Sequence, residues 1–376
     1  MLWHNCPTEI YDIALLWGGP SYGSSSRFRR LLRSLPRPHP DHQLEWHLQL
    51  YDQYTRLKRC LEIREDTPLL SDEDLEELKV IRGAPLNIDD FDPIDVEKRF
   101  FFSKPTRHRW AKWLAEQYLE DGEVWPEPEK ETRWVIDENG NRIPDICCVN
   151  YFANALWQMT DAWIDGGTMK HNPWWIVSRL YPVDPTGATG YGKVYTGPAN
   201  EHHEFEATST LLYQGGSRYG PNPQVPHIII ITYDTIIPDD RILRSELLLA
   251  VSILRRNLAL FPWLEHHTFP VLMLSFHETG ARILQMHAEN GYVIVRASRQ
   301  LVFPTDDGSI PADGLLMLTW MLAEPMGETS FSNMSVNTSS EEKKVCRHEG
   351  DLNVASTLGI PVVDGTDAVP LKHRAS

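Results

Sequence analysis

Four carboxylates that follow one short apolar segment are the residues best placed to do chemistry. The segment, Pro226–Tyr233 (PHIIIITY), is an apolar run bounded by turn residues and predicts a buried strand. Asp234 follows it directly, and Asp239, Asp240 and Glu246 come next. Because ligands of open α/β sheets bind beyond the carboxyl ends of the strands, we expect Asp234 either to face a ligand or to form an ordinary turn. Asp239 and Asp240 are equally explained as caps of a helix that follows.

A glycine-rich turn near the N-terminus is the second candidate. Gly18–Ser24 (GGPSYGS) follows the apolar run 10–17 and precedes a predicted helix over Arg27–Leu35. Backbone N–H groups at a helix N-terminus bind anions, and such a turn can also hold an activated serine, here Ser21. The turn lacks the complete nucleotide-binding patterns, so an ordinary strand–helix connection explains it equally well.

A basic cluster follows this turn directly and comprises Arg27, Arg29, Arg30, Arg33 and Arg37. Arginine side chains neutralise phosphates, so Arg29, Arg30 and Arg33 are candidates to bind a nucleotide or a tRNA backbone. The same pattern is also typical of a solvated helix face, which is the structural alternative.

A third candidate is the segment 202–206 (HHEFE). If it is a strand, His202, Glu204 and Glu206 share one face, because side chains alternate along a strand. Two carboxylates and an imidazole on one face suit a divalent metal or acid–base chemistry. A polar outer face with Phe205 inside is the alternative. We predict Glu204 and Glu206 to bind substrate, with no metal and no cofactor.

The elements around these residues predict an α/β or α+β fold with a mixed sheet flanked by helices. The strand 226–233, a helix from Pro238–Asp240 to about residue 261 and a strand at 271–276 predict a right-handed parallel crossover. Asn290-Gly291 joins two strands of a predicted hairpin, because this pair accepts the positive φ angles of a tight turn.

Further elements are predicted by the same rules. Ser71 and Asp74 form a capping-box pattern at a helix start. Helices are expected over 43–63, 105–119, 150–164 and 312–322, a hairpin over 133–149, a strand at 203–213 and a surface loop over 182–200. We divide the chain into a mostly helical N-terminal region with a short first strand (1–125), an α/β core (126–326) and a disordered tail (327–376).

Composition limits the class of protein. The chain has 376 residues, of which 41% are apolar, and a formal net charge of −16, which disfavours broad nucleic-acid or membrane-surface binding. Its five cysteines are odd in number and irregularly spaced, so no disulfide-linked partner is expected and a reducing compartment fits best. Without a secretory signal or a spanning segment, we expect a soluble, cytoplasmic protein that does not contact a membrane.

Residues 225–330 resemble a large set of mostly uncharacterised fungal proteins. The resemblance lies in IIITYDTIIPDDRILRSELL, PVLMLSF, GARILQMH and MLAEPMGETS, a pattern that is also similar to the fungal arginine-containing cyclodipeptide synthases. Those natural-product enzymes take arginine from its aminoacyl-tRNA, join it to a second amino acid and cyclise the pair.

The resemblance implies an aminoacyltransferase with aminoacyl-tRNA and an amino acid as substrates. Asp239, Asp240 and Glu246 would correspond to an acidic pair with a following Glu, although their spacing exceeds a compact DDxxE. Ser21 would stand in a similar Gly-x-Ser element. Because an aminoacyl ester is already activated, placing the amine against it would supply most of the catalysis, with Asp234 or Glu246 binding the arginine guanidinium.

Two other classes of protein stay open. Arg142–Asp145 resembles the PD element of PD-(D/E)XK nucleases, but no (D/E)-x-K triplet follows at short range, so this class predicts a degenerate nuclease. The third class is a non-catalytic interaction protein. Convergence of Asp145, Glu204 and Glu206 would favour a metal site.

Overall fold

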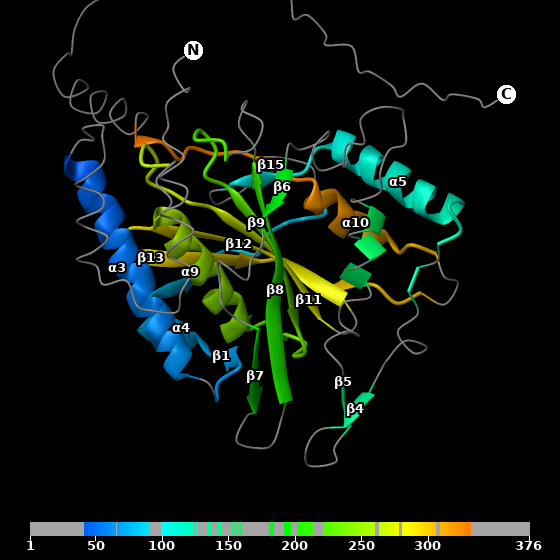
Figure 1. The fold of residues 1–376 in the computed structure, drawn as a ribbon, viewed down its shortest axis with the longest axis horizontal. Helices are drawn as coiled ribbons and strands as arrows, with labels where there is room; N and C mark the ends of the chain where they lie inside the picture. Colours follow the sequence, from blue (N-terminus) through cyan, green and yellow to red (C-terminus); the bar gives the residue numbers. More distant parts are fainter. Residues whose placement is uncertain are drawn as a thin grey trace, which may run out of the picture. The chain divides into compact units, whose positions relative to one another are not determined.

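A nine-stranded mixed sheet forms the centre of the structure, a computed structural model (Figure 1). Strands β9 and β11 are parallel, as are β13 and β2, and the other neighbours are antiparallel. The predicted mixed α/β fold is therefore confirmed. The strand order is β2 (Val80–Arg82), β13 (Tyr292–Ala297), β12 (Gly280–Glu289), β11 (Val271–His277), β9 (Ile228–Asp234), β8 (His202–Tyr213) and β6 (Leu180–Val183), with β14 (Leu301–Val302) beside β12 and β7 (Gly192–Thr196) beside β8.

The structure describes residues of one compact unit, Met1–Asn333, and none of the second, Met334–Ser376. The glycine-rich turn, the arginine cluster and residues 332–376 of the predicted tail therefore lie outside the described residues, whereas 327–331 are described and hydrogen-bonded to the rest of the unit. The predicted division into regions stays a prediction. The described residues are 41–64, 66–90, 99–123, 125–126, 134–136, 142–144, 152–153, 155–156, 158–159, 180–183, 192–196, 202–213, 221–259, 263–277, 280–305 and 309–331.

Helix α9 (Arg244–Ala259) connects the parallel strands β9 and β11, as the sequence predicts. The predicted start at Pro238–Asp240 is wrong, because the helix begins only at Arg244. Strand β10 (Ile242–Leu243) pairs there with β1 (Leu69–Leu70) in an antiparallel bridge. Asp239 therefore caps no helix, and its carboxylate accepts a hydrogen bond from the N–H of Arg241 at 2.7 Å.

Two local sequence signals are confirmed. Ser71 caps α4 (Asp72–Glu77), since its hydroxyl accepts from the N–H of Asp74 while the Asp74 carboxylate accepts from the N–H of Ser71. At the β12–β13 turn, Asn290 and Gly291 have φ angles of 51° and 81°, which an Asn-Gly pair adopts at low cost.

The remaining elements agree with most of the predicted ranges. Strand β7 is an exception, because residues 192–196 were expected in a loop. This strand has two glycine-rich flanks, which hide its pattern, and it forms by pairing with the long strand β8. The other elements are α3 (Asp41–Ile63), β3 (Phe101–Phe102), α5 (Pro105–Glu120), the hairpin strands β4 (Trp134–Ile136) and β5 (Arg142–Pro144), α10 (Ala312–Met321) and β15 (Glu324–Pro325).

Helices α3 and α9 cover one face of the sheet, and α5 and α10 cover the other (Figure 1). A hydrophobic core lies between the sheet and the helices on each face. Because side chains alternate along a strand, Ile228 and Ile230 of β9 join α3 and α9 in one core, whereas Ile229 and Ile231 join α5 and α10 in the other. The sheet is thus buried on both sides, which accounts for the continuous apolar runs of β9 and β11.

Candidate functional site

Polar side chains replace the apolar ones at the carboxyl ends of β9 and β11, on the face that α9 covers. Thr232, Ser275 and Arg282 lie side by side on adjacent strands, and each is no more than 2% exposed. Asp234 and His277 end their strands on the same face. We call the polar group at this end the clamp cluster; it consists of the buried residues Asp234, Ser245, Glu246, His277 and Arg282 and the half-buried Gln300.

Asp234 is buried, with 2% of its surface exposed, and it is the last residue of β9, at the carboxyl end of the strand as predicted. One carboxylate oxygen accepts a hydrogen bond from the hydroxyl of Ser245, the second residue of α9. The other oxygen accepts from the N–H of Ile236 at 2.7 Å, which closes a turn directly after the strand. Both carboxylate oxygens of Asp234 therefore already accept hydrogen bonds from within the protein.

Glu246 and Arg282 form a buried, two-pronged ion pair. The carboxylate oxygens of Glu246 accept from Nε and Nη2 of Arg282 at 2.9 and 2.5 Å, and one of them also accepts from the N–H of Leu243 at 3.0 Å. The two side chains are 1% and 2% exposed. Such planar pairs are among the stronger hydrogen-bonded contacts. Glu246 was expected to bind the guanidinium of an arginine substrate, but here it binds the guanidinium of Arg282.

The cluster also holds the loop between β9 and β10 in place. The carbonyl of Asp239 accepts from Nη1 of Arg282 at 3.2 Å, and the carbonyl of Pro238 accepts from the side-chain amide of Gln300 at 2.9 Å. Gln300 in turn accepts from Nε2 of His277 at 2.8 Å. Burial lowers the pKa of His277, so its ring is neutral at physiological pH and acts as a hydrogen-bond donor.

The other predicted site residues do not join this cluster through their side chains. Asp239 and Asp240 are exposed, and the Arg241 guanidinium holds the pKa of the Asp239 carboxyl below its usual range. Glu206 is half-buried on β8, whereas Glu204 lies in the same strand and its side chain is outside the description.

Several predicted residues lie wholly outside the described residues. They are Ser21, Arg29, Arg30, Arg33 and Asp145. Strand β8 itself is confirmed over the predicted HHEFE segment, with a β-bulge between Ala207 and Ser209. In the described part of the chain, no three His, Cys, Asp or Glu side chains are grouped so that they could hold a metal ion.

Sequence reasoning missed Ser245, Arg282 and Gln300 and gave His277 no role. Arg282 carried a usable signal, because an arginine within the apolar run GARILQMH requires a buried carboxylate partner. Ser245 and Gln300 carried none, since both are common surface residues and only the fold brings them to Asp234 and Pro238.

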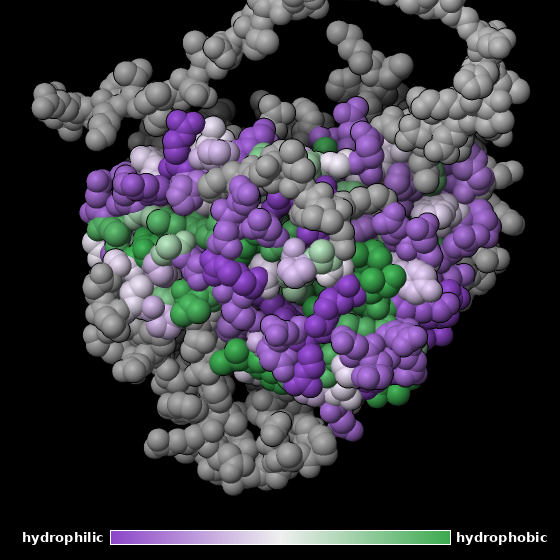
Figure 2. All heavy atoms as spheres, turned by 180° about the vertical axis from the view of Figure 1, so that it is seen from behind, coloured by the Kyte–Doolittle hydropathy of each residue, from purple (hydrophilic) through white to green (hydrophobic). Residues whose placement is uncertain are grey.

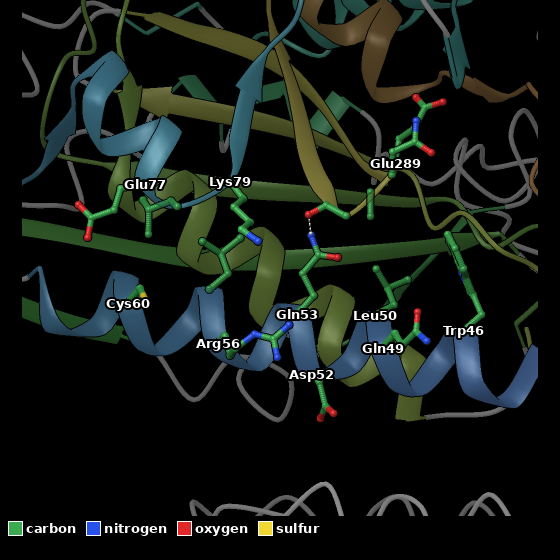
Figure 3. Close-up of a pocket in the computed structure, with 15 residues that line it drawn as sticks. Trp46, Gln49, Leu50, Asp52, Gln53, Arg56, Cys60, Glu77, Lys79 and Glu289 are labelled. Carbon is green, nitrogen blue, oxygen red and sulfur yellow. Dashed lines mark hydrogen bonds between the residues drawn. The ribbon is translucent and has the colours of Figure 1, made fainter.

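A second candidate is a groove of about 520 Å³ along α3 (Figure 3). Its walls are α3, the end of α4 with Lys79, and the β12–β13 turn. Trp46 lies at one end and Cys60, an exposed free thiol, at the other. Across it, the Gln53 side chain donates to the carbonyl of Gly291 at 2.9 Å, which ties the helix to the turn.

The groove has an apolar floor and a polar rim. Its buried lining residues are Leu50, Leu57, Leu78 and Ala288. Its exposed or half-buried polar lining residues are Gln49, Asp52, Gln53, Arg56, Glu77, Lys79, Glu289 and Asn290. This arrangement resembles a protein–protein interface, in which a desolvated apolar centre is surrounded by polar side chains.

Comparison with family models, curated proteins and solved structures finds no match to this chain, so the geometry alone carries the functional argument. In the part of the chain that the structure describes, no helix is long and apolar enough to cross a bilayer.

We expect Ser245→Ala to lower the free energy of unfolding by about 1.5–3 kcal/mol, because it removes a hydrogen bond to a buried carboxylate. Urea denaturation measures the change. Ser252→Ala is the matched control on the same helix, since among the described residues the buried Ser252 hydroxyl has no hydrogen-bond partner. Equal small losses in both variants would show that the Asp234–Ser245 contact does not stabilise the fold.

Proposed function

We propose that this chain is a non-catalytic interaction protein that binds a peptide segment of another protein in the groove along α3. The observation that carries the proposal is the apolar floor of this groove within a rim of exposed polar side chains. Asp234 and Glu246, which were expected to bind substrate, already form hydrogen bonds with Ser245 and Arg282. Their engagement supports the proposal indirectly.

The dimensions and chemistry of the groove suit a peptide. From Trp46 to Cys60 the axis of α3 rises about 21 Å, which matches roughly six residues of an extended chain or four turns of a helix. The rim carries both signs of charge, including Asp52, Arg56 and Lys79, so an occupant with alternating charges fits best. Figure 2 shows the molecule from behind the view of Figure 1, where polar side chains are interspersed with apolar areas.

Photo-crosslinking tests this proposal. A photoreactive amino acid at Arg56, in the groove, is expected to capture a discrete protein partner in cells of the source, and mass spectrometry should map its crosslinks to one short segment. The matched control places the same amino acid at Arg59, an exposed residue of α3 that does not line the groove. Identical adducts from both positions, or none from position 56, would contradict a partner in the groove.

A charge reversal then tests the identified contact. We expect Arg56→Glu to weaken binding of the captured segment by about tenfold and to leave the stability of the chain unchanged, because the side chain is exposed. Isothermal titration with the synthetic segment measures the affinity, and Arg59→Glu is the control.

Aminoacyl transfer is the second candidate function, with aminoacyl-tRNA and an amino acid as substrates. One observation favours it: Asp234 is buried at the carboxyl end of β9 beside the parallel strand β11, where α/β sheets bind ligands. Expression in a heterologous host, with mass spectrometry for arginine-containing diketopiperazines, tests it. A new product that disappears with Asp234→Asn would favour this candidate; soluble wild-type protein without a product would exclude it.

A cytoplasmic location is part of the proposal. The exposed thiol of Cys60 fits a reducing compartment, in which free cysteines persist.

A further inference from the structure

The segment after α10 crosses the end of the sheet at which the central strands β9 and β11 begin (Figure 1). Strand β15 pairs with β3, and the N–H of Met326 donates to the carbonyl of Phe100 at 2.9 Å. Farther along, the N–H of Phe331 donates to the carbonyl of Glu265, also at 2.9 Å. Backbone hydrogen bonds thus fix both ends of residues 324–331, which we call the strap.

Two buried histidines anchor the middle of the strap. Nε2 of His227 donates to the carbonyl of Met326 at 2.8 Å. Nε2 of His266 donates to the carbonyl of Pro223 at 3.0 Å, so its Nδ1 is the acceptor for the hydroxyl of Thr329 at 2.8 Å. A charged imidazole carries a proton on both ring nitrogens. Nδ1 of His227 is buried and has no hydrogen-bond partner among the described residues, so a proton added there would lack an acceptor. At His266, a proton on Nδ1 would replace the hydrogen bond that the Thr329 hydroxyl donates to the neutral ring.

The last residue of the strap, Phe331, packs in a cluster of aromatic rings. The ring of Phe331 lies edge-on against His42, Trp46, His47 and His267, with centroid distances of 5.6 to 6.4 Å. Trp46 in turn donates through its indole N–H to the carbonyl of His267 at 3.0 Å. Phe331, at the end of the strap, therefore packs against both the start of α3 and the segment that leads into β11.

Burial opposes a positive charge on both anchoring imidazoles. It lowers the pKa of His227 to about 4, and it is also the main cause that lowers the pKa of His266. A detached strap would expose both rings further to water, which moves their pKa values back toward 6.5. Acid therefore favours detachment, and His227 alone can shift the equilibrium by up to about two orders of magnitude as the pH falls from 6.5 to 4.

The groups around the two histidines do not offset the effect of burial on their pKa values. His227 faces the rings of Phe100, of Phe101 at the start of β3 and of Tyr213 from β8, while the nearby His266 also lowers the pKa of His227. The carboxylate of Glu265 raises the pKa of His266, but by less than burial lowers it. The charged groups near Tyr213 are Arg107 and Glu324, and the Glu324 carboxylate pairs with both Arg107 and Lys104.

We propose that the strap is an acid-sensitive latch, which leaves the sheet edge as a unit when His227 and His266 take up protons, while the sheet itself stays folded. This conformational switch goes beyond peptide binding in the α3 groove and does not depend on it.

The strap can move without the sheet for two reasons. Gly327 is exposed and has a φ angle of 82°, and as a glycine it can take up other backbone conformations at little cost once the strap leaves the sheet. The ion pairs of Glu324 with Lys104 and Arg107 are partly exposed and contribute little to stability, whereas β9 and β11 are buried on both faces.

Hydrogen exchange of the full chain tests the latch. At pH 7.5, 6.0 and 4.5, with labelling times corrected for intrinsic exchange, mass spectrometry follows a peptide over 323–331 and a reference peptide over 271–277. We expect protection of the strap peptide to fall by roughly 100-fold at pH 4.5 while the reference peptide stays protected. Unchanged strap protection, or loss of both peptides at one pH, would overturn the proposal.

A variant that cannot take up the protons provides a second test. The double substitution His227→Gln and His266→Gln keeps an N–H donor at each anchor, so the strap should stay protected at pH 4.5. His108→Gln is the control, because His108 bonds to Thr319 on α10 and lies outside the strap. Acid release in the double variant would contradict the proposed role of the two histidines. If that variant does not fold, the wild-type pH series decides alone.

Discussion

Glu246→Gln is expected to lower the free energy of unfolding by about 3–5 kcal/mol, because it leaves the guanidinium of Arg282 buried without a counter-charge. The loss is large because neither side chain is more than 2% exposed, so water cannot replace the missing carboxylate. The same substitution also weakens the hold of Arg282 on the carbonyl of Asp239. Urea denaturation followed by far-UV circular dichroism measures the change.

The exposed pair Asp239–Arg241 supplies the matched control. Its atoms are only 2.8 Å apart, but its two side chains are 54% and 47% exposed. Arg241→Gln should therefore cost less than about 1 kcal/mol. A loss from Glu246→Gln no larger than that of Arg241→Gln would mean that the buried pair does not support the fold.

Trp125→Ala should produce a loss of similar size, about 3–5 kcal/mol. Trp125 is 1% exposed, packs on the rings of Phe152 and Phe303, and donates its indole N–H to the carbonyl of Phe303 at 2.9 Å. The variant removes this packing and leaves that carbonyl without its indole donor. Trp110→Ala, a half-buried tryptophan on α5, should cost less.

The Trp125 variant also tests the predicted boundary at residues 125 and 126. Because Trp125 contacts residues beyond that boundary, we expect circular dichroism and tryptophan fluorescence to shift to lower urea concentrations together. Two separate transitions, of which only one shifts, would instead support an N-terminal region that folds by itself.

Periodic and turn signals made much of the fold predictable. The apolar runs at β9 and β11, the Asn-Gly turn after β12 and the capping box at Ser71 each depend on neighbours in sequence, so a local pattern reveals them. The start of α9 and strand β7 were predicted wrongly, because each depends on pairing with a distant strand, β1 and β8 respectively.

The candidate site was only partly predictable for a related reason. The position of Asp234 follows from the strand that precedes it, but its partner Ser245 is set by the way α9 packs onto the sheet. Glu246 looked like a ligand-binding carboxylate because the sequence does not show that Arg282, 36 residues later, reaches it. The α3 groove combines three separate segments, and no local pattern indicates it.

We infer that the clamp cluster serves the fold, and we propose that recognition takes place in the α3 groove. A double-mutant cycle with Glu246→Gln and Arg282→Met in urea denaturation tests the role of the clamp cluster. We predict a coupling free energy of about 1.5–3 kcal/mol, the range for hydrogen bonds to charged groups. Coupling near zero would contradict the account, because Glu246 would then be available to a substrate.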